Sequence, residues 1–399
     1  MKKRRTLTIP LFMMIIMSFV TGCATTGVIV HDGFDLPEQG HYNLATLQYY
    51  FKRYNYSNRR GYTVPPSKNV YEFETELRDD KHVLAELEKT ALVSYLLFEN
   101  NKIVVDHKSP DGRFGALFDD NTQLISNSEG KGIVGYALAH AICEGYISGI
   151  DEKMIDYPLI ENTLYEDQPI LNLLNMAGGD QLYVNNHGFI GTRFSVNGET
   201  ISTRFLQSNP TKNKLLKTNA RFNYNNLQPN LVANYIAFKM GAKKYEVMMA
   251  RIWNKAGNEN TIFMSGNRYT RYSYGSKANK GVYRHNFSAS RYDYLRIARA
   301  IMEDWNNNTC EGELLKEMYT KRIKRNYQGG GHFNHYTGYG AFFHTDMAYT
   351  KDRKIIALDG YGGQMIVIDL DRKRIVATNA VHLNYNWRKI VTDPIKNGV

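Results

Sequence analysis

The feature that most constrains the fold is the way strand-like and helix-like segments are separated along the chain. Apolar runs at 92–98 and 103–105 flank a polar turn, a pattern that predicts a β-hairpin. The stretch between about 150 and 325 shows mostly helical spacing. Further strands are expected at 340–343, 355–358, 365–369 and 375–379. We therefore predict an α+β fold, with an antiparallel sheet built from both ends of the domain, flanking helices and a mostly helical inserted subdomain.

The N-terminus has the organisation of a signal peptide. Basic residues at 2–5 precede an apolar stretch at 7–20, which is shorter than the about 20 residues that a helix needs to cross a bilayer. The segment 20–23, Val-Thr-Gly-Cys, resembles the lipobox of bacterial lipoproteins, in which Cys23 would carry the lipid. The alternative is an ordinary secretory signal with a chance cysteine. We therefore expect a lipid-anchored envelope protein. Because Ala24 differs from the Asp of inner-membrane retention signals, the protein would face the periplasm from the outer membrane if the cell has two membranes.

The length of the chain allows two or three lobes, or one large domain. Of the 399 residues, 43% are hydrophobic, which is sufficient for a large core. We divide the chain into a signal peptide (1–22), a tether and accessory segment (23–80) and a globular domain (81–399). The formal net charge is +11, of which the basic residues at 2–5 contribute four. Because the other basic residues are scattered, nucleic-acid binding is not expected, and the predicted partners are a small substrate and the membrane.

Two cysteines, Cys143 and Cys310, follow the predicted lipidation site. An oxidising compartment would allow them to form a disulfide. The apolar helical surroundings of Cys143 are equally consistent with a buried free thiol, so the sequence leaves both states open. Three cysteines give no zinc-binding spacing, and no metal or organic cofactor is expected.

A serine and a lysine stand one turn apart at the start of a predicted helix over 129–147. Ser128 and Lys131 would lie on the same face of that helix. A serine hydroxyl becomes a useful nucleophile when a neighbouring base accepts its proton, and a buried, neutral lysine can do so. On its own the pair is also consistent with a helix N-cap and a solvated charge.

Two further motifs follow in order, and together the three resemble the class C β-lactamase-like serine hydrolases of the penicillin-binding-protein superfamily. Tyr224-Asn225-Asn226 precedes an apolar helix, and Gly360-Tyr361-Gly362-Gly363-Gln364 follows a strand. The segment 131–147 and the Leu-Leu-Asn-Met-Ala-Gly-Gly run at 173–179 also resemble that family. The similarity covers about 83–399. It implies a β-lactamase/transpeptidase-like fold and an acyl-enzyme reaction.

The resemblance implies a role for each site residue. Ser128 would be the nucleophile and Lys131 its base, with Tyr224 as co-base and later proton donor. It leaves open whether Lys131 or Tyr224 is the general base. Asn226 would orient Lys131 and a substrate carbonyl, and the N–H groups of Ser128 and Tyr361 would form the oxyanion hole. The substrate and oxyanion group is predicted to comprise Asn226, Gly360, Tyr361 and Gly362.

The sequence departs from the family at the strand motif. Leu358 and Asp359 stand where β-lactamases and D,D-peptidases have Lys-Thr or His-Thr, a pair that helps to hold the substrate carboxylate. We therefore expect weak β-lactam turnover and a closer relation to the esterase and 6-aminohexanoate-dimer-hydrolase branches. Gly130, which replaces a common Ser or Thr, lies at a variable position. The predicted function is hydrolysis of an ester or amide bond. The alternatives are a D,D-carboxypeptidase or β-lactamase-like cell-wall enzyme, and a catalytically inactive envelope binding protein.

Overall fold

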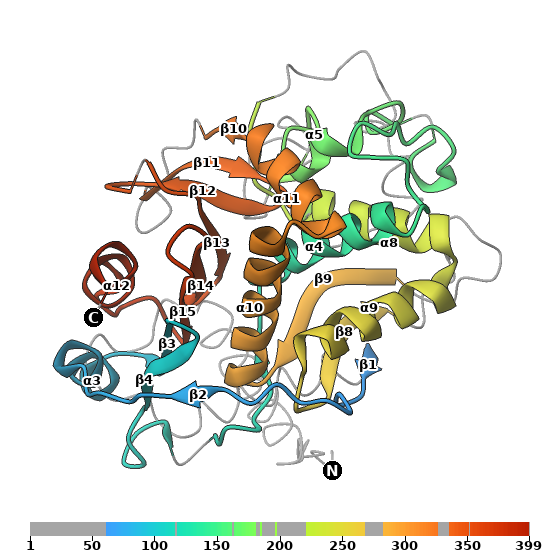
Figure 1. The fold of residues 1–399 in the computed structure, drawn as a ribbon. Helices are drawn as coiled ribbons and strands as arrows, with labels where there is room; N and C mark the ends of the chain where they lie inside the picture. Colours follow the sequence, from blue (N-terminus) through green and yellow to red (C-terminus); the bar gives the residue numbers. More distant parts are fainter. Residues whose placement is uncertain are drawn as a thin grey trace, which may run out of the picture.

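The computed structural model describes residues 61–115, 118–161, 163–180, 221–267, 282–325, 335–350 and 352–398, with the short strands β6 (Val184–Asn185) and β7 (Val196–Asn197). Nine described strands form the main sheet: β2 (Glu74–Thr75), β3 (Leu92–Glu99), β4 (Lys102–Lys108), β10 (Ile323–Lys324), β11 (Tyr336–Gly340), β12 (Phe343–Met347), β13 (Ile355–Gly360), β14 (Gln364–Asp369) and β15 (Arg374–Ala380). Their order in the sheet is β10-β11-β12-β13-β14-β15-β3-β4-β2 (Figure 1).

The sheet joins the two ends of the domain, as the sequence predicts. The last strand, β15, pairs with β3 in an antiparallel register that places Ala377 opposite Leu96. The hairpin β3–β4 turns at Asn100 and Asn101, which both have the left-handed backbone conformation (φ 53° and 61°) that asparagine tolerates. All neighbouring strands are antiparallel except β2 and β4, which are parallel. The predicted α+β class and the antiparallel sheet are therefore confirmed.

Helices cover both faces of this sheet. The described helices are α3 (Lys81–Lys89), α4 (Glu129–Cys143), α5 (Ile170–Leu174), α8 (Leu227–Met240), α9 (Ala242–Ala256), α10 (Arg291–Asn307), α11 (Cys310–Thr320) and α12 (Asp393–Asn397), with a 3-10 turn at Pro158–Ile160 and a π turn at Arg388–Thr392. Helices α4 and α10 pack on one face, whereas α3 and α12 cover the other (Figure 1). On β13, Ile356 and Leu358 belong to the larger core, and Ile355 and Ala357 to the smaller one. Burial on both faces explains the uninterrupted apolar run of this strand.

A second sheet lies within the middle of the chain, which the sequence indicated only as helical. Strands β8 (Ile262–Asn267) and β9 (Val282–Ala289) pair with each other, and their outer neighbours are β1 (Tyr62–Val64) and β5 (Leu124–Ile125). The described part of the insertion is therefore mixed. Its strands matter for function because β5 leads directly into Ser128.

The end of the predicted accessory segment runs along the domain. Strand β1 joins the second sheet through β8, and β2 joins the main sheet through β4. Between them, the Arg299 guanidinium stacks 3.5 Å from the ring centre of Tyr71. Residues 61–80 thus connect the two sheets. The signal peptide, Cys23 and the rest of the tether lie outside the described residues.

Helix α4, which follows Ser128, is buried on all sides along residues 129–141. Its glycines allow this close packing, because a Cβ on Gly130 would lie 1.7 Å from the carbonyl oxygen of His285 and one on Gly135 would lie 2.1 Å from that of Ala341. The close packing against the His285 backbone therefore explains why position 130 is Gly and not the Ser or Thr that is common at this position. Within the described parts of the chain, no helix is long and apolar enough to span a membrane.

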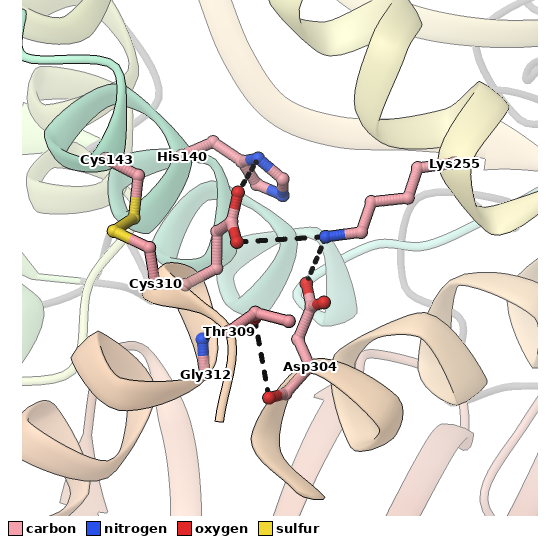
Figure 2. The surroundings of a disulfide bond; sticks show 8 residues. His140, Cys143, Lys255, Asp304, Thr309, Cys310 and Gly312 are labelled. Atoms are coloured by element: carbon pink, nitrogen blue, oxygen red, sulfur yellow. Dashed lines mark hydrogen bonds and ion pairs between the residues drawn. A yellow bond between two sulfur atoms is a disulfide. The ribbon is translucent and has the colours of Figure 1, made fainter. Parts of the chain in front are cut away.

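A disulfide fastens the other end of α4. Cys143, its last residue, is bonded to Cys310, the first residue of α11. Figure 2 shows this bond beside His140, Lys255 and Asp304, which lie on three different helices. The structure thus settles the question that the sequence left open.

Candidate active site

Ser128 lies at the junction between the second sheet and α4. The preceding residues are held by β9, because the Ser126 amide donates to the Phe287 carbonyl (2.8 Å) and the Phe287 amide donates to Ser126 Oγ (2.9 Å). Asn127 then adopts a left-handed conformation (φ 47°) that turns the chain into the helix. Ser128 makes no capping hydrogen bond through its side chain. Its hydroxyl is therefore not used as an N-cap.

Lys131 makes a short contact with this hydroxyl. Its Nζ lies 2.5 Å from Ser128 Oγ, and the side chain is fully buried. The same nitrogen lies 2.7 Å from Asn226 Oδ1 and 3.2 Å from the Tyr224 hydroxyl. The structure therefore brings together four of the predicted site residues. Burial disfavours the charged form of a lysine, and a neutral amine can accept a proton from serine.

The aromatic ring of Tyr224 packs against the amine of Lys131. Its ring centre lies 4.6 Å from Lys131 Nζ. Burial raises the pKa of the Tyr224 phenol well above its ordinary value, while its hydrogen bond with Ser128 acts in the opposite direction. The tyrosine is thus a neutral phenol at physiological pH. In this state it can donate a proton, and Lys131 is better placed to be the first acceptor.

The glycine-rich turn between β13 and β14 lies against the start of α4. Gly360 pairs with Gln364 across this hairpin, and Gly362 takes a positive φ of 89°. The Asn127 side chain donates a hydrogen bond of 2.6 Å to the carbonyl oxygen of Tyr361. A Cβ on Gly360 would lie 2.5 Å from the Ser126 carbonyl oxygen, so only glycine allows this approach. The turn is therefore adjacent to Ser128, where the resemblance expects the second oxyanion donor.

The two residues that depart from the family motif are both buried. Leu358 is 1% exposed, and its Cγ would lie 2.9 Å from a Cβ added to Gly132 of α4. A lysine at that position would need to enter an apolar interface. Asp359 is 2% exposed, and its charge adds to burial in raising the pKa of the Glu129 carboxyl beside the nucleophile. Neither residue offers a cation to a substrate carboxylate.

Tyr339, which lies in a segment that resembles the family's Tyr-Gly-aromatic strand, and two residues that the sequence did not single out, His344 and Arg325, lie around Tyr224. The rings of Tyr339 and His344 lie 6.0 Å from the ring of Tyr224, measured between ring centres. Arg325 Nη1 lies 3.1 Å from His344 Nδ1. Tyr339 belongs to a Tyr-Gly-aromatic segment of recognisable pattern, but nothing in the sequence places Arg325 near this site. No cluster of three or more potential metal ligands occurs among the described residues.

Comparisons with known proteins agree on the fold. No protein-family model matches the sequence, and a search of curated proteins found no match. A solved structure from Bacillus anthracis, assigned as a 6-aminohexanoate-dimer hydrolase, superposes with a TM-score of 0.60 at 13% identity, covering 90% of this chain and 96% of its own. D-amino acid amidase from Ochrobactrum anthropi SV3, solved with L-phenylalanine amide, gives 0.53 at 13% identity, covering 79% and 94%. An octameric penicillin-binding protein homologue from Pyrococcus abyssi gives 0.54 at 15%, covering 78% and 74%. The chain therefore has the β-lactamase/transpeptidase-like fold.

Proposed function

We propose that this protein is a serine hydrolase that cleaves an ester or amide bond through an acyl-enzyme on Ser128. One observation carries the proposal: a buried lysine nitrogen lies 2.5 Å from a serine hydroxyl that caps no helix. The same nitrogen contacts a phenol and an amide oxygen, and all three contacts are compatible with a neutral amine.

The reaction follows from this arrangement. Ser128 Oγ attacks the substrate carbonyl while its proton passes to the neutral amine of Lys131. The carbonyl oxygen becomes an oxyanion, for which the Ser128 and Tyr361 N–H groups are the proposed donors. The Tyr224 hydroxyl then gives its proton to the leaving alcohol or amine and regains one from Lys131. Water attacks the acyl-enzyme by the same route in reverse, which releases the acid and restores Ser128.

The preferred substrates are esters and amides that carry no carboxylate beside the scissile bond. Buried Leu358 replaces the lysine that holds such a carboxylate in β-lactamases, and Asp359, which is also buried, offers no cation either. The 6-aminohexanoate-dimer hydrolase and D-amino acid amidase with the same fold are named for reactions on amide bonds. This supports the esterase and amidase branch over a β-lactamase or D,D-carboxypeptidase.

The enzyme is proposed to act in the cell envelope, anchored by a lipid on Cys23. The support is the N-terminal sequence, with its basic residues, apolar run and Val-Thr-Gly-Cys segment. The full chain should separate with membranes in a cell fractionation experiment. A Cys23→Ala variant should lose metabolic labelling by a palmitate analogue. Unchanged labelling of that variant would contradict the anchor.

A substrate panel tests the proposed activity. Short-chain nitrophenyl esters, D- and L-amino acid amides and a chromogenic cephalosporin would be incubated with the full chain and with its Ser128→Ala variant. We expect ester or amide hydrolysis that the variant loses, and slower turnover of the cephalosporin. Equal turnover of the cephalosporin would favour the cell-wall enzyme. Hydrolysis that survives in Ser128→Ala would show that the site is elsewhere.

A further inference from the structure

A buried carboxylate lies behind the loop that carries Tyr224. Asp180 is fully buried and accepts hydrogen bonds from four side chains, and we call this group the Asp180 cluster. Tyr165 and Gln228 donate to Oδ2 at 2.8 and 3.0 Å. Asn225 donates to the same oxygen at 3.1 Å, and Asn223 donates to Oδ1 at 2.6 Å. Every one of these contacts uses a neutral donor.

Two members of the cluster flank Tyr224 in the sequence. Asn223 and Asn225 point toward Asp180, whereas Tyr224 and Asn226 point toward Lys131. Successive side chains of this segment therefore point to opposite sides of it. The segment therefore lies between two buried polar groups, the Asp180 carboxylate on one side and the Lys131 amine on the other.

The cluster also fixes the backbone on both sides of Tyr224. Before it, the Asn223 amide donates to the Met176 carbonyl oxygen at 2.7 Å. After it, Asn225 Oδ1 accepts from the amides of Leu227 and Gln228, both at 3.0 Å, and so caps the start of α8. The Asn225 amide group donates at the same time to Asp180. The carboxylate thus links the loop to the start of the following helix.

We infer that Asp180 is a positioning residue, which sets the place of Tyr224 and Asn226 around Lys131. The inference rests on the proposed hydrolase function and extends it to a residue that does not touch Lys131 or Ser128 in any described contact. A buried carboxylate is costly to desolvate, and apolar packing would serve stability as well. The Asp180 carboxylate differs from apolar packing because its hydrogen bonds have preferred directions. Four such bonds fix the path of the segment more narrowly than apolar contacts do.

The test uses a pair of variants that break and restore one contact. In Asp180→Asn, an NH₂ group replaces one of the two carboxylate oxygens. In one orientation the three donors that now bind Oδ2 face an N–H group, and in the other orientation the donor that now binds Oδ1 does. In Asp180→Asn with Asn223→Asp, the new amide at 180 can donate to the new carboxylate at 223. Its oxygen can still accept from the three remaining donors. The double variant should therefore recover what the single variant loses.

Two readouts are measured on the full chain. The first is the rate of labelling by a fluorophosphonate probe, which reports activation of the nucleophile. We expect about a 10- to 100-fold decrease in Asp180→Asn, the range that a displacement of about 1 Å can produce, and recovery to within several-fold in the double variant. The second is the fluorine NMR signal of 3-fluorotyrosine incorporated at position 224. It should be single in wild type, shifted or split in Asp180→Asn, and restored in the double variant.

Controls separate positioning from stability. Asp304→Asn removes another buried carboxylate, which binds Lys255 at 2.7 Å, and should lower thermal stability without changing the labelling rate or the fluorine signal. If Asp180→Asn does not fold, Asn223→Ala removes only the Oδ1 contact and should show a smaller change of the same kind. In the Tyr224→Phe background, Asp180→Asn should cost much less than in wild type, because both changes act through one group.

The outcomes distinguish the inference from the function on which it rests. If wild type is not labelled, the proposed function fails, and the fluorine signal still tests the positioning of Tyr224. If wild type is labelled but Asp180→Asn changes neither the labelling rate nor the signal, the inference is wrong. A slower rate with an unchanged signal would also overturn it, because Asp180 would then act by another route.

Discussion

A polar cluster that includes a lysine lies near each end of helix α4, and the two lysines differ in burial and in partners, because Lys131 is fully buried whereas Lys255 is 39% exposed. At the N-terminal end, Lys131 contacts the Ser128 hydroxyl at 2.5 Å and the Asn226 amide oxygen at 2.7 Å. Near the C-terminal end, Lys255 binds the carboxylates of Asp304 at 2.7 Å and Glu311 at 3.8 Å. Figure 2 shows Lys255 and Asp304 beside the disulfide.

From this difference in partners we propose a chemical role for Lys131 and a structural role for Lys255. Lys255 forms ion pairs with carboxylates of two other helices, so it joins α9 to α10 and α11. The hydroxyl and amide neighbours of Lys131 can be satisfied by a neutral amine, which is the form that can remove a proton from serine. In the proposed function, α4 carries the lysine that accepts the serine proton, whereas Lys255 of α9 binds carboxylates near the other end of α4.

Removing each lysine in turn should have the largest effects. Lys131→Met should reduce labelling and hydrolysis by about 10³-fold or more, because the serine loses its base, with little change in folding. Lys255→Met should leave activity near that of wild type and lower the free energy of unfolding by about 1–3 kcal/mol, because Asp304 stays buried with its charge less compensated. Labelling rates and chemical denaturation would be measured on both. Similar losses of activity in the two variants would contradict the assigned roles.

Removing the Tyr224 hydroxyl tests whether this residue protonates the leaving group. Tyr224→Phe should lower kcat by about 10²- to 10⁴-fold, the range for loss of a general acid or base. Esters with good leaving groups should be affected least, because they need little protonation on departure. Steady-state kinetics on esters with a series of leaving groups would check this. A loss that is the same for every leaving group would point to Tyr224 as a base for attack instead.

The disulfide should affect stability and leave the chemistry intact. Cys143→Ser with Cys310→Ser should lower the free energy of unfolding by about 2–5 kcal/mol, the usual range for a native disulfide. At temperatures where the variant remains folded, the labelling rate of Ser128 should match that of wild type. Denaturant unfolding and labelling of the two proteins would be compared. Loss of labelling in a folded variant would show that the C-terminal cluster also sets the geometry of Ser128.

The smallest expected effect is a pH dependence of stability from His140. Burial, opposed in part by Glu311, lowers the pKa of His140 to about 4. The contact between His140 Nδ1 and Glu311, at 2.9 Å, is therefore a hydrogen bond of a neutral imidazole at pH 7. Because the unfolded chain binds this proton near pH 6.5 and the folded chain does not, stability falls as pH drops from about 6.5 toward 4. Wild type should lose about 2 kcal/mol more than His140→Gln between pH 7 and pH 5, measured by denaturant unfolding.

The sequence predicted the fold class, the hairpin β3–β4 and the joining of both chain ends in one sheet, because these depend on local apolar patterns. The resemblance to the β-lactamase-like serine hydrolases also indicated that Ser128, Lys131, Tyr224 and Asn226 belong to one site, and the structure places them together. It indicated no strands in the middle of the chain. The register of β8 and β9 depends on pairing with β1 and β5, which lie far away in the sequence.

Two parts of the site could not be predicted because they depend on tertiary contacts. Asp180 follows a Gly-Gly pair that reads as an ordinary loop, and three of its four partners come from the segment 223–228, which lies more than 40 residues away in the sequence. The hydrogen bond from Asn127 to Tyr361 joins residues 234 positions apart. The pairing of Cys143 with Cys310 needed the packing of α4 against α11, for which helical periodicity gives no information.

The central claim is that Ser128 is an activated nucleophile, and intact mass spectrometry tests it most directly. The full chain and its Ser128→Ala variant would be incubated with a fluorophosphonate probe, and their folding would be checked by circular dichroism. We predict one covalent adduct on the wild-type chain and none on the variant. A folded wild-type chain that gains no adduct, or a variant that still gains one, would contradict the account.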